Sequence, residues 1–320
     1  MTLETESVLD RRNLRRRVGF WRGAAIAAAI LAAGTVASQL LPAGIGDQKH
    51  IARITIDGLI TEDRDVLRLM KRVGENKSIQ AVILSINSGG GTTTGGEALF
   101  EAIRGMAKEK PVVAQFGTVA ASAAYIAGLA TDHIVARGNS ITGSVGVIFQ
   151  WPEVSGLLDK VGVKVNEIKS GPLKAVPSMF EPISPAGRVT TEAMVAESQT
   201  WFLSLVTDRR KINTAQVPGL EQGRVFSGRE ALTYKLVDAV GGEAEVVRYL
   251  EDVRKTPKKL RIVDWRPRRE GEFSWLRLSM SAVKGLFGGD ADASLFNMDS
   301  RISPLLLDGL VSVWHPAEKQ

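Results

Sequence analysis

The chain has 320 residues, of which 44% are hydrophobic and 24% are charged, a composition typical of a globular protein. It contains no cysteine, which excludes disulfide bonds, thiolate metal sites and cysteine catalysis. The formal net charge of +6 is concentrated in two basic groups, at residues 11–22 and 254–269, and this distribution does not indicate nucleic-acid binding.

Residues 23–41 form an apolar run without a charge, which is about the length that a helix needs to cross the hydrocarbon core of a bilayer. Arginines cluster before this run and few charges follow it, so the positive-inside rule places residues 1–22 in the cytoplasm and the rest of the chain outside. A cleaved signal peptide is the alternative. The length of the run and the lack of an A-x-A cleavage site favour a permanent single-pass anchor.

Residues 48–260 are expected to form the folded domain. Short apolar runs predict strands at residues 51–56, 81–86, 111–116, 133–136 and 165–170. Helical patterns are found at residues 63–73, 94–108 and 190–211 and around Ser122, whereas the proline-containing stretch 171–188 is predicted to be irregular. Repeated β-α units with short connections predict an α/β domain whose mainly parallel sheet is covered by helices.

A glycine-rich stretch, SINSGGGTTTGG at residues 85–96, follows a predicted strand and precedes a predicted helix. It has neither the G-K-[ST] ending of a phosphate-binding loop nor the G-x-G-x-x-G pattern of a dinucleotide site. Glycines would let backbone N–H groups approach a substrate carbonyl, as an oxyanion hole requires. A tight turn without chemistry explains the glycines equally well, and the sequence leaves both interpretations open.

Ser122 and Lys174 are the candidate catalytic pair. Ser122 stands among alanines, so its hydroxyl is not crowded by its sequence neighbours. Lys174 lies in the stretch SGPLKAVP, with no other charge between Lys169 and Glu181. A lysine in an apolar site loses its proton more easily, and it can then act as the base that a serine nucleophile needs. The pair therefore predicts a serine–lysine dyad.

The chain has only three histidines, His50, His133 and His315, one of which a Ser-His-Asp triad would have to use. His133 opens an apolar predicted strand, and we expect it to be structural. His50 follows the apolar run and His315 lies in the C-terminal tail, so neither is expected in a packed site. Lys174 remains the better candidate for the base.

Five separated motifs carry a resemblance to a known family. They are INSGGG (86–91), GTVAASAAYIAGLATDHIVA (117–136), ITGSVGVI (141–148), IKSGPLK (168–174) and GRVFSGREALTYKLVDAVGG (223–242). In order and spacing they resemble the bacterial signal peptide peptidase family in its short, single-repeat form. The resemblance runs from about residue 51 to residue 250.

This resemblance implies a ClpP/crotonase-like fold and a serine endopeptidase that works through an acyl-enzyme without a metal or other cofactor. Ser122 would be the nucleophile and Lys174 the base. The oxyanion hole would come from the backbone N–H groups of Ala123 and of Gly90 or Gly91. Ser144 would orient the lysine, although a simple turn hydroxyl is the alternative for that serine.

The resemblance also implies the surroundings of the enzyme. The substrates would be hydrophobic peptides such as remnant signal peptides, and nucleic acid is not among the expected partners. The peptidase domain would lie on the periplasmic side of the bacterial inner membrane. It would enclose its sites in a homo-oligomeric ring, in which Ser122 of one subunit pairs with Lys174 of the next.

Three departures from the family pattern are visible. Gly89 stands where a proline is usual, Ala123 and Ala124 replace two glycines, and Lys235 replaces another glycine. None removes a catalytic atom, so we expect them to affect rate and substrate preference and to leave the mechanism intact.

The C-terminal extension, residues 261–320, lies beyond the resemblance. Its apolar stretches at 273–288 and 303–314 suit either packing on the domain or a neighbouring subunit, or an interfacial membrane helix. Two other functions remain open for the whole chain. One is a non-proteolytic acyl-thioester enzyme of the same fold, and the other is a membrane-tethered interaction protein with a vestigial dyad.

Overall fold

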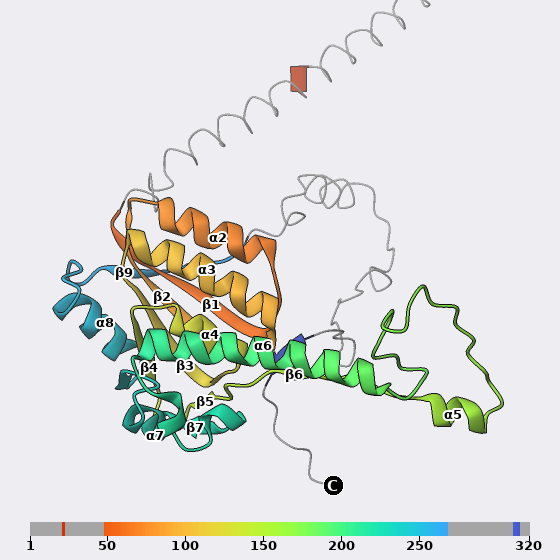
Figure 1. The fold of residues 1–320 in the computed structure, drawn as a ribbon. Helices are drawn as coiled ribbons and strands as arrows, with labels where there is room; N and C mark the ends of the chain where they lie inside the picture. Colours follow the sequence, from red (N-terminus) through yellow and green to blue (C-terminus); the bar gives the residue numbers. More distant parts are fainter. Residues whose placement is uncertain (1–20, 23–47, 268–309, 314–320) are drawn as a thin grey trace, which may run out of the picture. The chain divides into compact units, whose positions relative to one another are not determined.

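The computed structural model describes residues 21–22, 48–267 and 310–313 (Figure 1). The described residues from His50 onward belong to one compact unit. Among the described residues, no helix is both long and apolar enough to cross a membrane. The predicted anchor at residues 23–41 and the apolar stretch 273–288 lie outside the described residues.

A mainly parallel sheet forms the centre of the domain, as predicted. Its order across the middle is β9 (Arg261–Trp265), β1 (His50–Ile60), β2 (Ile79–Thr92), β3 (Val112–Ala121), β4 (His133–Ala136) and β8 (Ala239–Val240), all parallel. Four of the five predicted strands are therefore confirmed. Because the carboxyl ends of parallel strands meet at one edge, the ends of β2 and β3 lie close together, and Ser88 pairs with Ala120.

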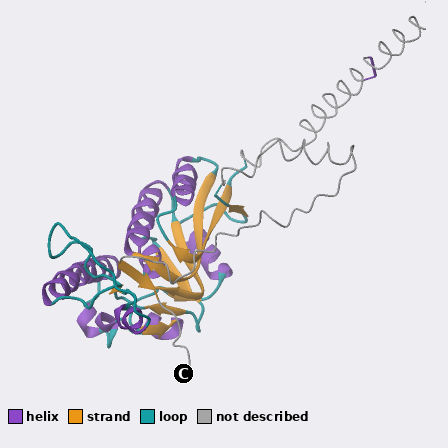
Figure 2. Ribbon diagram, turned by 90° about the vertical axis from the view of Figure 1, so that its right-hand side faces the viewer, coloured by secondary structure: helices purple, strands orange, loops and turns teal. Residues whose placement is uncertain are grey.

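Helices cover both faces of the sheet (Figures 1 and 2). One face packs against α2 (Arg64–Glu75), α3 (Thr93–Glu109), α4 (Ala123–Leu129) and α6 (Pro185–Arg210). The other packs its smaller apolar cluster against α8 (Glu243–Asp252), through Val246 and Leu250. Strands buried on both faces read as continuous apolar runs, which is why 81–86 and 111–116 were recognisable.

Several short elements follow β4, and their strands extend the same sheet. β5 (Ile141–Gly143) pairs with β3 and with β7 (Val225–Ser227), which leads into α7 (Gly228–Thr233). Two 3₁₀ turns, Thr214–Gln216 and Leu220–Gln222, connect α6 to β7. These elements bring residues 143–144 beside the end of β3.

The prediction of a strand at residues 165–170 is wrong. This stretch forms no strand in the structure, and most of its residues are exposed. The short helix α5 (Ser155–Lys160) precedes it. A strand needs a neighbouring strand to complete its backbone hydrogen bonds, and residues 165–170 are not in the sheet.

Helix α6 begins at Pro185, five residues earlier than the predicted helix at 190–211, so the irregular stretch ends at Ser184. The Ser184 side chain accepts a hydrogen bond from the Gly187 N–H, and Pro185 occupies the first helical position. Serine at the N-cap and proline in the first turn both favour the start of a helix.

The C-terminal extension contributes two strands to the sheet, so the sheet continues beyond residue 260. β9 pairs with β1 from His50 to Ile54. β10 (Leu310–Val313) lies antiparallel to the last residues of β2 on one side and to β6 (Ile148–Phe149) on the other. A segment more than 200 residues away in sequence from β2 thus lies directly beside the glycine-rich stretch.

Candidate active site

Ser122 occupies the turn between β3 and α4, where it is fully buried. Its backbone angles, φ 60° and ψ −124°, are sparsely populated by residues other than glycine. Its N–H donates to the Gly143 carbonyl at 2.9 Å, and its carbonyl accepts from the Ile126 N–H at 3.0 Å. A strained serine on a sharp strand-to-helix turn is the geometry that aims a nucleophilic hydroxyl away from its own backbone.

Ser144 lies beside this turn. It follows Gly143, which pairs with Ala121 across β5 and β3. Ser144 also has a positive φ, 51°, and its N–H donates to the Arg224 carbonyl at 3.0 Å. The structure thus brings Ser122 and Ser144 together at the ends of adjacent strands.

A pocket of about 360 Å³ opens beside Ser144. Its walls include the apolar side chains Val147, Ile148 and Val195, together with Gln199 of α6. The Gln199 amide nitrogen donates to the carbonyls of Val145 and Glu221, each at 3.3 Å. The pocket therefore combines a hydroxyl near the nucleophile with an apolar wall.

The predicted oxyanion glycines lie at the end of β2. Gly90 has a φ of 122°, and its N–H donates to the Ser88 hydroxyl at 3.1 Å. A Cβ atom on Gly91 would lie 1.8 Å from the Ile60 carbonyl oxygen, so no side chain fits there. The Gly90 N–H is thus engaged by Ser88, and Gly91 lies between β1 and β10, opposite Ile60 and Ser312.

Asn87 and Ser88 hold this stretch in place, a role that the sequence did not reveal. The Asn87 side-chain oxygen accepts from the N–H groups of Thr118 and Val119, at 3.0 and 3.2 Å. The Ser88 hydroxyl donates to the Gly58 carbonyl at 2.6 Å. The sequence does place these two polar residues directly before the glycines, and this was the signal for their role. A buried loop needs hydrogen-bond partners for its backbone groups, and polar side chains can supply them.

Gly91→Ala should lower both stability and peptidase activity, because a methyl group cannot fit against the Ile60 carbonyl. Gly105→Ala is the matched control, since a Cβ atom there meets nothing within 4 Å and alanine favours the helix by about 0.5–1 kcal/mol. We expect a lower melting temperature for the first variant and an equal or higher one for the second. Equal behaviour of the two variants would contradict this packing.

His133 lies at the opposite edge of the sheet from Ser122. It pairs with Val113, near the start of β3, and Ser122 follows the other end of that ten-residue strand. A parallel strand rises about 3.3 Å per residue, so the two residues are about 30 Å apart. His133 stacks on Tyr249 with ring centroids 3.8 Å apart, and burial lowers its pKa. It is structural, as expected, and does not serve Ser122.

Lys174 lies in a segment that extends away from the sheet. We call residues 150–184 the arm; it includes α5 and leads into α6 (Figure 1). Lys174 is exposed, whereas Ser122 is buried at the end of β3. Figure 1 shows the part of the arm between α5 and α6 running well clear of α4. The single chain does not bring the arm to the Ser122 turn.

The arm is unusually apolar for an exposed segment. Its exposed large hydrophobic residues are Leu157, Val161, Val163, Val165, Ile168, Leu173, Met179 and Phe180. Exposed apolar surface of this extent is typical of a contact with another protein molecule.

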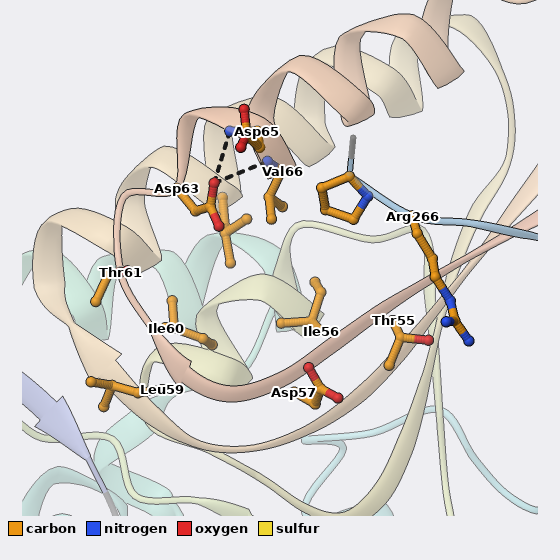
Figure 3. Close-up of a pocket in the computed structure, with 12 residues that line it drawn as sticks. Thr55, Ile56, Asp57, Leu59, Ile60, Thr61, Asp63, Asp65, Val66 and Arg266 are labelled. Atoms are coloured by element: carbon orange, nitrogen blue, oxygen red, sulfur yellow. Dashed lines mark hydrogen bonds between the residues drawn. The ribbon is translucent and has the colours of Figure 1, made fainter. Parts of the chain in front are cut away.

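A separate groove of about 710 Å³ lies between the end of β1 and the start of α2 (Figure 3). The Asp63 carboxylate in it accepts from the N–H groups of Asp65 and Val66, at 2.8 and 3.3 Å, and so caps α2. Arg266 forms part of another wall. None of the predicted catalytic residues lines this groove, and its best-placed carboxylate is already used as a helix cap.

Comparisons with known proteins indicate a peptidase. The profile described as "Peptidase family S49" matches residues 104–256. The chain is 33% identical over 209 residues to a putative protease of Synechocystis sp., a match that covers 65% of this chain and 75% of that protein. It is 27% identical over 272 residues to a putative signal peptide peptidase SppA of Enterococcus faecium, with 80% and 78% covered.

Longer relatives match in part. The chain is 29% identical over 213 residues to protease 4 of Haemophilus influenzae, a match that covers 63% of this chain and 34% of that protein. A solved structure of a membrane-bound stomatin-specific protease aligns with a TM-score of 0.44 at 14% identity, over 69% of this chain and 99% of the other, a likeness too weak to carry an argument. With the match to the Synechocystis protein, the family profile and the strained serine in view, the chain belongs to peptidase family S49, the signal peptide peptidase family, and is a serine-type peptidase.

Proposed function

We propose that the chain is a membrane-anchored endopeptidase in which Ser122 is the nucleophile and Lys174 the general base. Neutral Lys174 accepts the hydroxyl proton while the Ser122 oxygen attacks the peptide carbonyl carbon. The C–N bond breaks, the leaving amine takes that proton, and the acyl group stays on Ser122. Water then attacks this ester with Lys174 as base, and the proton returns to Ser122 as the acid leaves.

The observation that carries this proposal is the backbone of Ser122. A non-glycine residue held at φ 60° costs free energy, and such strain persists where the surroundings enforce it. Here the β3–β5 pairing and the Gly143 carbonyl fix the turn. Ala123 begins α4, so its N–H has no partner within the helix and is available to a developing oxyanion.

The end of β2 supports binding of the substrate as an extended strand. β10 pairs there antiparallel, with Ser312 opposite Gly91 and Val313 opposite Gly90, and its other edge pairs with β6. A peptide that took the place of β10 would gain backbone hydrogen bonds from both sides. Its scissile carbonyl would then pass close to the glycines and to the Ser122 turn.

We propose that the dyad is completed between two copies of the chain. The arm carries Lys174 away from its own Ser122, and its exposed apolar side chains suit burial against a neighbouring subunit. Lys174 of the neighbour would reach Ser144, whose hydroxyl would hold the amine toward Ser122. Closure of such contacts into a ring would keep folded proteins away from the site.

The pocket beside Ser144 and the names of the relatives support a proposal for the substrate class. Val147, Ile148 and Val195 offer an apolar wall in the pocket that Ser144 lines, which favours hydrophobic peptides. Relatives named signal peptide peptidase suggest that these peptides are remnant signal peptides. An anchor at residues 23–41 would hold the enzyme at the membrane from which such peptides are released.

A fluorophosphonate probe tests the proposal, because it reacts only with an activated serine. We expect one covalent adduct, mapped by mass spectrometry to Ser122 and absent from Ser122→Ala.

A chain that lacks residues 304–320, and with them β10, should react with the probe about tenfold faster. The tethered β10 strand competes for the substrate position at a high effective concentration. An acyl-thioester enzyme or a chain with a vestigial dyad would not be labelled at Ser122. Absence of this label would therefore refute the proposal.

A further inference from the structure

The edge of the sheet opposite the Ser122 turn carries lysines in a regular arrangement. Four neighbouring parallel strands, β9, β1, β2 and β3, begin at this edge. Each is preceded by lysine: Lys49 before β1, Lys77 before β2, Lys110 before β3, and Lys258 and Lys259 before β9. Parallel pairing therefore gathers residues that are distant in sequence into one basic surface, which we call the lysine edge.

The neighbouring helix ends do not neutralise this surface. Further basic residues at the same edge are Lys71, Arg72, Lys108, Arg210, Arg254, Lys255 and Arg261, and the acidic residues there are Glu75, Glu109, Asp132, Asp238, Glu251 and Asp252. Asp132 is paired with Arg104 and Arg254, at 3.8 and 3.4 Å, Asp238 is paired with Arg210 at 2.8 Å, and Asp252 is paired with Lys258 at 3.7 Å. The basic residues at this edge still outnumber the acidic ones. The lysine edge therefore keeps an excess of positive charge.

A groove of about 790 Å³ between α2 and α3 opens at the lysine edge. Its lining combines Met70 and Met106 with Lys71, Lys77 and Lys110, and also includes Glu75 and Glu109. The Lys110 ammonium donates to the carbonyls of Val73 and Asn76, at 2.8 and 2.6 Å, so it stays close to the backbone at this edge. An apolar floor beside ammonium groups suits an amphipathic, negatively charged ligand.

The chain itself indicates which ligand meets this edge. Only residues 42–49 separate the apolar run 23–41 from His50, the first residue of β1. At about 3.5 Å per residue, this connection spans at most about 28 Å. An anchored chain therefore holds the lysine edge within reach of lipid headgroups, where anionic lipids attract clustered basic residues.

We propose that the lysine edge docks on the anionic phospholipid headgroups of the membrane, an inference that rests on the anchor in the proposed function. Ser122 follows the far end of the ten-residue β3, so docking places the nucleophile about 30 Å from this surface, facing away from the bilayer. Peptides would then reach the site only after leaving the membrane, whereas those still inserted would be spared.

The test uses the full chain in lipid nanodiscs, and the absence of native cysteine allows single labels. Pro257→Cys reports on the lysine edge, and Glu62→Cys, just after β1, reports on the opposite edge. Each is labelled with a fluorophore, and headgroup nitroxides act as quenchers. We expect strong quenching at residue 257 and little at residue 62 in discs with about 30% phosphatidylglycerol, and weaker quenching at residue 257 in phosphatidylcholine alone.

Charge variants separate docking from simple anchoring. Lys77→Glu combined with Lys258→Glu should reduce quenching at residue 257 to the level in neutral discs. The matched pair Arg64→Glu and Arg188→Glu, both exposed and away from this edge, should leave it unchanged. Inorganic phosphate should reduce quenching at residue 257 no more than chloride does at equal ionic strength. A loss of quenching that is specific to phosphate would show that free phosphate, and not a lipid headgroup, is the ligand.

Three further results would overturn the proposal: equal quenching in anionic and neutral discs, no response to the lysine variants, or a response to the arginine variants as well. These results would leave the peptidase itself untouched, because peptide hydrolysis is measured in the same discs. If the chain does not incorporate into the discs, the proposed anchor is refuted, and the docking proposal is refuted with it.

Discussion

Ser122→Ala and Lys174→Ala should each lower kcat/KM for a hydrophobic peptide by about a thousandfold or more, because members of a catalytic unit fail together. For the same reason, the double variant should be no worse than either single variant. Lys169→Ala is the matched control: it removes a lysine from the same arm, one that is already paired with Glu167 and Glu181. It should keep most of the activity.

Retention of more than a few per cent of activity in Lys174→Ala would show that another group takes the proton. His133 is not a candidate for that role, because it lies at the opposite edge of the sheet. A loss in Lys169→Ala as large as in Lys174→Ala would mean that the arm is needed as a structure and that no single ammonium on it acts as base.

Ile168→Glu should dissociate the proposed assembly of subunits and lower the rate of peptide hydrolysis at least tenfold. A loss of roughly this size is expected when an apolar contact in an interface is replaced by an unpaired charge. Ile168 is fully exposed in the single chain, so the substitution should not disturb the fold. Val253→Glu, at an exposed apolar residue after α8, is the control and should change neither property. Sedimentation velocity gives the mass, and peptide hydrolysis gives the rate.

If Ile168→Glu stays assembled and active, the arm does not form the contact. If it dissociates and keeps full activity, a single chain is sufficient for catalysis and the dyad must form within one subunit.

The central strands could be predicted because their residues are apolar on both faces of the sheet. The runs at 81–86 and 111–116 lie in β2 and β3, whose core residues are buried on either side. The run at 165–170 has a similar pattern but lies in the exposed arm, because a local pattern does not say whether a partner strand exists. The early start of α6 was visible in the sequence, since Ser184 and Pro185 form a recognisable helix start.

The site could be predicted in its residue types and only partly in its geometry. Motif order pointed to Ser122, Ser144 and the glycines, and the structure brings these to the ends of β3, β5 and β2. The positive φ of Ser122 and the engagement of Gly90 by Ser88 depend on tertiary contacts. The pairing of β10 with β2 joins two distant segments, so no window of sequence contains it.

Subunit mixing tests the central claim, that Ser122 of one copy works with Lys174 of another. Inactive Ser122→Ala and Lys174→Ala proteins are combined under conditions that allow exchange, and exchange is verified by energy transfer between labelled copies. Mixed assemblies contain interfaces with both native residues, so we expect hydrolysis to return to a substantial fraction of the wild-type rate, with fluorophosphonate labelling only on the Lys174→Ala copies. Mixtures that exchange fully and stay inactive would contradict the account and place both residues of the dyad in one chain.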